Sequence, residues 1–168
     1  MESEGLNFND KDSIKNKICK KCRGLSKILN GLKNVKGLPV SMFLNNSNKE
    51  QINAYLEKLN YENYNFESDD FLKKDLKKKE LYETILKFKI KNLNLSKDQF
   101  NYYKNKLKTS LYSYHSAVGI AKKIDFEIVV VYSPQYEINN FFCEGLNSVK
   151  TFKTYFIEGS ENVYLKHS

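Results

Sequence analysis

Residues 96–132 read SKDQFNYYKNKLKTSLYSYHSAVGIAKKIDFEIVVVY, and this stretch decides the predicted fold. Ser96 followed three residues later by Gln99 forms a capping box, which predicts the start of a long helix. Residues 126–132 are mostly β-branched or aromatic and precede Ser133-Pro134, a pattern typical of a strand that ends there. Between the two, apolar side chains recur at helical spacing, at Phe100, Tyr103, Leu107, Leu111, Tyr114 and Val118.

Three further segments are predicted on the C-terminal side and just before this stretch. Residues 149–157 and 162–166 predict a hairpin joined by Glu158-Gly159-Ser160-Glu161, and residues 141–146 predict a short helix between strand and hairpin. Upstream, apolar residues of the segment 86–90 alternate with lysines, which is typical of a half-buried strand. These elements together predict a β-α-β unit followed by a hairpin.

The N-terminal third is predicted to be helical. Residues 1–10 predict a flexible tail. Residues 11–36 predict an amphipathic helix with a lysine-rich face opposite an apolar stripe. The stripe includes Ile28 and Leu32, and its residues Cys22 and Leu25 are expected to cover a core. Residues 40–44 predict a short strand or a buried connector, and Ser47 with Glu50 predicts a capping box that opens a second helix.

The chain is therefore expected to be one α+β domain over residues 11–168. N-terminal helices are followed by a β-α-β-hairpin unit, with a mixed or antiparallel sheet covered by helices on one face. A chain of 168 residues with 40% hydrophobic residues is long and apolar enough for one core. No apolar run approaches the roughly 20 residues that cross a bilayer, so no transmembrane segment is expected. The acidic N-terminus does not resemble a secretory signal, and three cysteines without framework spacing favour a reducing, cytoplasmic location.

The basic residues are almost all lysine. Arg23 is the single arginine, Trp is absent, and Asn, Ile, Tyr and Phe are abundant, which indicates an AT-rich genome such as that of an intracellular parasite, a virus or a phage. Part of the lysine content then reflects codon usage, so the sequence pI of 9.2 is weaker evidence for an anionic partner than usual.

The position of the charge is stronger evidence than its total. The segment 11–36 holds nine basic residues and one acidic residue, whereas the residues after 36 sum to about +3. These nine are the predicted nucleic-acid-binding residues: Lys11, Lys15, Lys17, Lys20, Lys21, Arg23, Lys27, Lys33 and Lys36.

A lysine-rich helix of about 25 residues is roughly 35 Å long and matches a phosphate backbone. Scarcity of arginine argues against reading of base edges, so structured RNA is the expected partner. Tyrosines interleaved with lysines on the helix that begins after Ser96 could add base stacking. Alternatively, half of them are core residues and the lysines are a solvated face. The residues in question are Tyr102, Tyr103, Tyr112 and Tyr114, with Lys104, Lys106 and Lys108.

The predicted function is thus a non-catalytic RNA-binding protein, associated with the ribosome or another ribonucleoprotein. One alternative is an adaptor or host-interaction factor whose basic helix meets an acidic protein surface. Another is contact of the same helix with an anionic membrane surface, which the lack of Trp or Phe on its apolar face disfavours.

Catalytic and metal chemistry have weaker support in the sequence. Cys19 and Cys22 have CxxC spacing, but no second pair completes four zinc ligands, and buried cysteines explain the spacing without metal. His115 could serve a metal-free nuclease, or with Cys143 a nucleophile pair, yet no carboxylate at helical spacing orients its ring. Glycine-rich phosphate loops are also absent from the sequence. The sequence therefore predicts no catalytic residues, no metal, no cofactor and no small-molecule substrate.

Overall fold

The computed structural model describes residues 20, 24, 27–28, 30–35, 37–62, 64, 74–91, 94–132, 136–157 and 163–166. The chain divides into two compact units, Met1–Pro39 and Val40–Ser168, and each is described by itself.

In the first unit, the predicted helix ends earlier than residue 36. Residues 31–34 form a turn, in which Gly31 N–H donates to the carbonyls of Lys27 and Ile28 at 3.1 Å each. Asn34 has a φ of 66°, a left-handed conformation that does not continue a helix. Ile28 and Leu32, two residues of the predicted apolar stripe, are 65% and 51% exposed.

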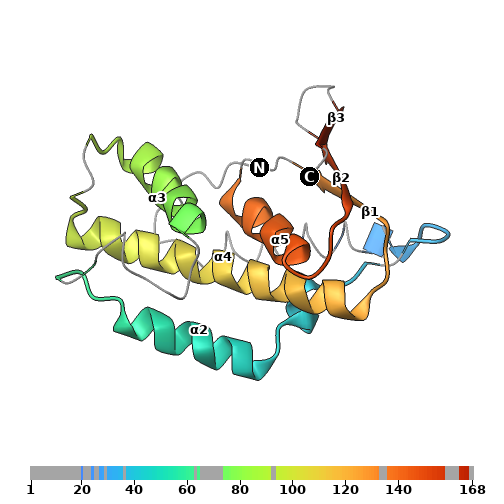
Figure 1. Cartoon of the computed structure of the whole chain (residues 1–168), viewed down its shortest axis with the longest axis horizontal. Helices are drawn as coiled ribbons and strands as arrows, with labels where there is room; N and C mark the ends of the chain where they lie inside the picture. The colour runs from blue at the N-terminus through green and yellow to red at the C-terminus, as the bar shows by residue number, and fades with distance from the viewer. Residues whose placement is uncertain are drawn as a thin grey trace. The chain divides into compact units, whose positions relative to one another are not determined.

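The second unit contains helices followed by a β-α-β unit, which confirms the α+β class (Figure 1). In chain order, its elements are the 3-10 helix η2 (Val40–Phe43), α2 (Asn46–Lys58), α3 (Lys74–Phe88), α4 (Lys97–Lys123), β1 (Ile128–Tyr132), α5 (Glu137–Asn147), β2 (Lys153–Ile157) and β3 (Val163–Lys166). The strand or connector predicted at residues 40–44 is thus a 3-10 turn.

The N-cap of helix α2 lies two residues before the predicted one. Asn45 is the N-cap, and its side-chain Oδ1 accepts from Asn48 N–H at 2.7 Å. Asn is as good an N-cap as Ser. The Asn45 side chain accepts from an amide of the first turn that has no partner within the helix. Ser47 therefore lies inside the helix.

The strand predicted at residues 86–90 is wrong, because α3 continues to Phe88. Lys89 has a φ of 50°, Ile90 N–H donates to Ile85 O at 3.1 Å, and Lys89 N–H donates to Leu86 O at 3.4 Å. This pair of bonds around a left-handed residue is a Schellman motif, which terminates a helix. Leu86 and Phe88 are exposed, so their alternation with lysine does not mark a buried strand face.

Helix α4 confirms its capping box and forms the axis of the unit. Ser96 Oγ accepts from Gln99 N–H at 3.4 Å, and Gln99 Oε1 accepts from Ser96 N–H at 2.7 Å. One core joins α2, α3, α4 and α5 around Tyr103 and Phe141, and a second core joins the C-terminal end of α4 to α5 and the sheet around Ala117 and Phe152.

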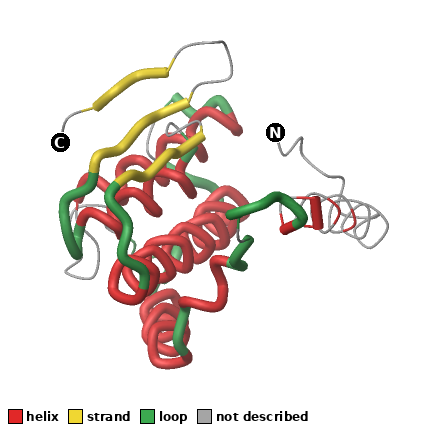
Figure 2. The backbone as a smooth tube through the Cα atoms, turned by 90° about the vertical axis from the view of Figure 1, so that its right-hand side faces the viewer, coloured by secondary structure: helices red, strands yellow, loops and turns green. Residues whose placement is uncertain are grey.

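The sheet is not antiparallel throughout. Strands β1 and β2, joined by α5, are parallel, with Val130 opposite Tyr155, while β3 pairs antiparallel with β2. The β-α-β unit is therefore formed by β1, α5 and β2, and the long helix α4 precedes it. The three strands lie side by side in one sheet (Figure 2). Val131 is buried, whereas Val130 is 59% exposed, so the two faces of β1 differ in burial.

Two glycines allow close approach to α4. A Cβ on Gly145 of α5 would lie 2.3 Å from Tyr114 O, and a Cβ on Gly119 of α4 would lie 2.3 Å from Phe43 O of η2. Both distances are shorter than any real contact of this kind, so α5 and η2 pack with their backbones directly against α4.

Candidate nucleic-acid interface

The positive charge of the second unit is concentrated on α3 and α4. Residues 74–123 hold thirteen lysines and four acidic residues, a net charge of +9. The flanking segments 37–73 and 124–168 together carry −6. The net charge of all residues after 36, about +3, conceals this contrast. The predicted basic helix at 11–36 is therefore not the only segment of the chain with a concentrated positive charge.

Helix α4 has a solvent-facing side that is poor in acidic residues. Asp98, exposed in the first turn, is the one acidic residue of α4, and none occurs from Gln99 to Ile124. Along the N-terminal part of the helix, the residues on this side are exposed or half-buried and lie at helical spacing. We call them the α4 face: Asn101, Tyr102, Asn105, Lys106, Lys108, Thr109 and Tyr112.

Tyr102 lies at the centre of a group of cations and aromatic rings at the α3 side of the α4 face. Lys87 Nζ is 3.8 Å and Lys106 Nζ is 5.8 Å from the Tyr102 ring centroid. The Phe88 ring meets the Tyr102 ring edge-to-face, with centroids 5.3 Å apart and an interplanar angle of 88°. These four residues are the Tyr102 cluster, and neither lysine has an ion pair within the described part of the chain.

The structure divides the tyrosines and lysines that were predicted for stacking. Tyr103 is fully buried, with its hydroxyl 2.6 Å from that of Tyr64, and Lys104 Nζ donates to Leu59 O at 3.0 Å. Tyr114 is half-buried beside the core. Tyr112 also packs against this core at the edge of the α4 face, with Lys108 Nζ 5.6 Å from its centroid, and Tyr102 remains on the face. Burial in the core is therefore confirmed for part of the set, and base stacking by the exposed part stays a prediction.

Sequence reasoning missed Lys87 and Phe88, because the segment 86–90 was assigned to a strand. The signal that could have placed them is the helical spacing of Leu81 and Ile85, which lie on the core side of α3.

Three of the nine predicted binding residues of the first unit are described. Lys20 and Lys27 are helical and exposed, and Lys33 lies exposed in the turn after the helix. The other six lie outside the described residues: Lys11, Lys15, Lys17, Lys21, Arg23 and Lys36. Cys19 and Cys22 also lie outside them.

His115 lies half-buried on α4, facing α2. Its Nδ1 is 3.1 Å from Asn48 Nδ2, and its ring meets the Tyr114 ring edge-to-face. Because the Asn48 amide donates, Nδ1 is the acceptor and Nε2 carries the proton of the neutral ring. Burial lowers the pKa of His115 from its ordinary value of 6.5, which favours this neutral form. The site thus holds one neutral imidazole beside an amide, not a paired acid and base.

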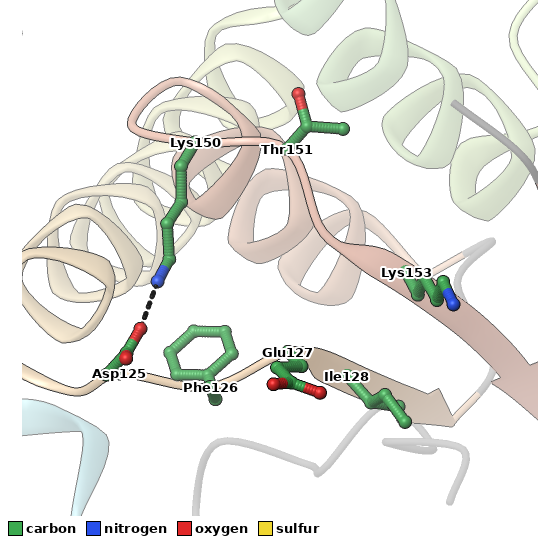
Figure 3. Close-up of a pocket in the computed structure, with 7 residues that line it drawn as sticks. All are labelled: Asp125, Phe126, Glu127, Ile128, Lys150, Thr151 and Lys153. Carbon is green, nitrogen blue, oxygen red and sulfur yellow. Dashed lines mark hydrogen bonds and ion pairs between the residues drawn. The ribbon is translucent and has the colours of Figure 1, made fainter.

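A hollow of about 430 Å³ lies where β1 and β2 begin (Figure 3). Lys150 Nζ is 2.7 Å from Asp125 Oδ1 and 5.1 Å from the centroid of Phe152, which stacks on Phe126. The ion pair lowers the pKa of Asp125. Two lysines and two acids line the hollow, so it lacks the single charge sign of the α4 face; its residues are Asp125, Phe126, Glu127, Ile128, Lys150, Thr151 and Lys153.

Within the described ranges, His, Cys, Asp and Glu side chains form no group of three or more that could hold a metal ion. Cys143 is half-buried, and it forms no disulfide with another described residue. Among these same residues, no helix has both the length and the apolar character needed to cross a bilayer.

Comparisons of the chain with protein families, with curated proteins and with solved structures give no match. The function is therefore argued from the surface described above.

Proposed function

We propose that this protein is a non-catalytic RNA-binding protein, in a ribonucleoprotein such as the ribosome, that contacts the phosphate backbone through lysine-rich helices. The observation that carries the proposal is the α4 face, where lysines and tyrosines occur together and the one acidic residue of the helix, Asp98, lies in the first turn before them. Such a surface suits a polyanion, because each lysine that neutralises a phosphate releases a condensed counterion and adds affinity independent of base sequence.

The partner chemistry follows from the residue types. Lysine ammonium groups act as point charges and lack the planar fork with which arginine reads guanine edges. The α4 face offers amides, hydroxyls and ammonium groups on a convex helix surface, all of which donate to phosphate and ribose oxygens. Structured RNA, recognised by its backbone and 2′-hydroxyls, fits these donors better than a specific DNA operator does.

The charged helix of the first unit supplies a second part of the proposed contact. Lys20 and Lys27 are exposed, and their positive charge suits the same type of anionic partner as the α4 face does. The two surfaces belong to separate units, so each is tested by its own variant.

The test compares two double variants with the same change in net charge. K106E/K108E changes the α4 face, whereas K58E/K153E changes an α2 and a β2 lysine that are exposed elsewhere. Affinity for a labelled RNA hairpin is measured by fluorescence anisotropy at low salt. We expect K106E/K108E to bind at least tenfold more weakly, since two phosphate contacts become repulsive, and K58E/K153E to bind nearly as the wild type.

A third variant, K20E/K27E, measures the contribution of the first unit by the same assay. The proposal is wrong if wild-type protein does not bind the hairpin. It is also wrong if K106E/K108E and K20E/K27E both bind the hairpin as tightly as K58E/K153E does. Capture of one protein partner by nuclease-treated wild type, without RNA affinity, would instead support the acidic-protein alternative.

A further inference from the structure

We propose that Tyr102 is a positioning residue that holds Lys87 and Lys106 ready for one phosphate of a bound RNA strand. This inference rests on the proposed RNA-binding function and names the point within the α4 face where the backbone would be gripped.

The two ammonium groups come from different helices but converge on one ring. Their distances to the Tyr102 centroid are 3.8 and 5.8 Å, so the two nitrogens are at most 9.6 Å apart. Two like charges this close in one surface patch repel each other unless something compensates. Within the described chain, no carboxylate pairs with either lysine, so the electron-rich ring face is what attracts both cations.

The ring itself is held in place. Phe88 meets it edge-to-face at 5.3 Å, and Lys87 Nζ is also 5.6 Å from the Phe88 centroid. Phe88 and Lys87 are the last residues of α3, whose end is fixed by the Schellman motif at Lys89. Tyr102 and Lys106 are one helical turn apart on α4. The Tyr102 cluster is thus positioned by two helix backbones and not by a loop.

This arrangement favours an anion with several acceptor oxygens. A lysine that is already placed loses less side-chain entropy when it binds than one that samples all its rotamers. A phosphate brought to the two ammonium groups would neutralise their repulsion and accept hydrogen bonds from both. The closeness of Lys87 to the ring also means that this face of Tyr102 is occupied, so the cluster is suited to a phosphate and not to a stacked base.

The test uses a variant that keeps the charge and removes the ring. We expect Tyr102→Leu to bind a labelled RNA hairpin about threefold more weakly than wild type, because both lysines lose the cation–π contact. Tyr102→Phe keeps the ring face and should bind as wild type. Thermal unfolding of each variant shows whether it is folded.

A second measurement does not depend on Tyr102. The double variant K87A/K106A should lower the slope of log affinity against log salt concentration by about 1, because the two lysines neutralise one phosphate together. The matched variant K58A/K153A should leave the slope unchanged.

Three results would overturn the inference. They are wild-type affinity in folded Tyr102→Leu, a wild-type salt slope in K87A/K106A, and tighter binding in Lys87→Ala, which would show that the ring face stacks a base. If any of these occurs while K106E/K108E still loses affinity, the proposed function stands and only the role of the cluster fails. If wild-type protein does not bind the hairpin, both fail.

Discussion

The two halves of α4 differ in what their side chains do. In residues 97–112, large side chains such as Tyr103 and Leu107 fill a core on one side, and the opposite side is the lysine-rich α4 face. In residues 113–123, small residues such as Ala117 and Gly119 allow η2 and α5 to approach the helix backbone. The N-terminal half therefore combines a core side with the exposed surface that we propose binds RNA, and the C-terminal half packs closely against other backbones.

This difference separates stability from binding within a single helix. Substitutions at the small residues should destabilise the protein without altering the charge of the α4 face. Substitutions at the lysines of the α4 face should alter binding without affecting the cores. The following predictions test that separation, from the largest expected effect to the smallest.

Gly145→Ala should lower the free energy of unfolding by about 3 kcal/mol, because overpacking forces two backbones apart. The new Cβ would lie 2.3 Å from Tyr114 O and 2.9 Å from the Cβ of Ala117. Urea denaturation followed by circular dichroism measures the change. Asn147→Ala, at an exposed position of the same helix, is the control and should change little. Wild-type stability of Gly145→Ala would mean that α5 does not approach α4 so closely.

Val131→Ala should cost about 2 kcal/mol in unfolding free energy, through lost apolar burial and a small cavity. Its neighbour Val130 is 59% exposed, so Val130→Ala should stay within about 0.5 kcal/mol of wild type. The same urea assay compares the two. Equal losses for both would contradict the assignment of the inner face of β1 to the core beside the C-terminal half of α4.

Tyr103→Phe tests the core side of the N-terminal half and should cost about 1 kcal/mol. It removes a buried hydroxyl that lies 2.6 Å from the Tyr64 hydroxyl. Tyr112→Phe, on the α4 face, is the matched control and should leave stability unchanged. A similar loss in Tyr112→Phe would show that the face contributes to folding.

Lys89→Gly should raise the free energy of unfolding by about 0.5 kcal/mol, because glycine adopts a φ of 50° without the strain of a side chain. Lys91→Gly, at an exposed position just beyond, should give no such gain. Thermal unfolding measures both. A loss of stability in Lys89→Gly would argue against the Schellman motif at the end of α3.

His115 should make stability depend weakly on pH. Its pKa is lowered in the folded state, so its neutral form is favoured there, and this contribution is complete above the unfolded value of 6.5. It is lost as the pH falls through the lower folded value, since the protonated ring prefers the unfolded chain. Wild-type protein should therefore lose more stability between pH 7 and pH 5 than His115→Gln. Identical profiles would show that the ring is not desolvated between α2 and α4.

The sequence predicted the elements whose local signals agree with their tertiary setting. The capping box at Ser96, the β-branched run of β1 and the C-terminal hairpin segments all lie close to where they were expected. It failed at residues 86–90, because alternation over five residues does not distinguish a strand from the amphipathic last turn of a helix. The roles of Gly119 and Gly145 could not be predicted, since they depend on which backbones meet in space.

The candidate site was predicted only in part. Tyr102, Lys106 and Lys108 were named from their spacing, and burial then removed Tyr103 and Lys104 from the exposed set. Lys87 could not be joined to Tyr102 from sequence, because the contact crosses between two helices. The positive charge of α3 and α4 can be counted from the sequence. The acidic flanking segments cancel most of it when the net charge of all residues after 36 is taken together.

The central claim is that RNA contacts the basic α4 face and not the neutral hollow beside β1 and β2. Ultraviolet crosslinking of the intact protein to an RNA hairpin, followed by mass spectrometry of the peptides, tests it directly. The account predicts crosslinked peptides from residues 87–112, at Phe88, Tyr102 or Tyr112, which disappear in K106E/K108E and persist in K58E/K153E. Crosslinks confined to residues 125–128 and 150–153, or none from a bound complex in residues 87–112, would contradict it.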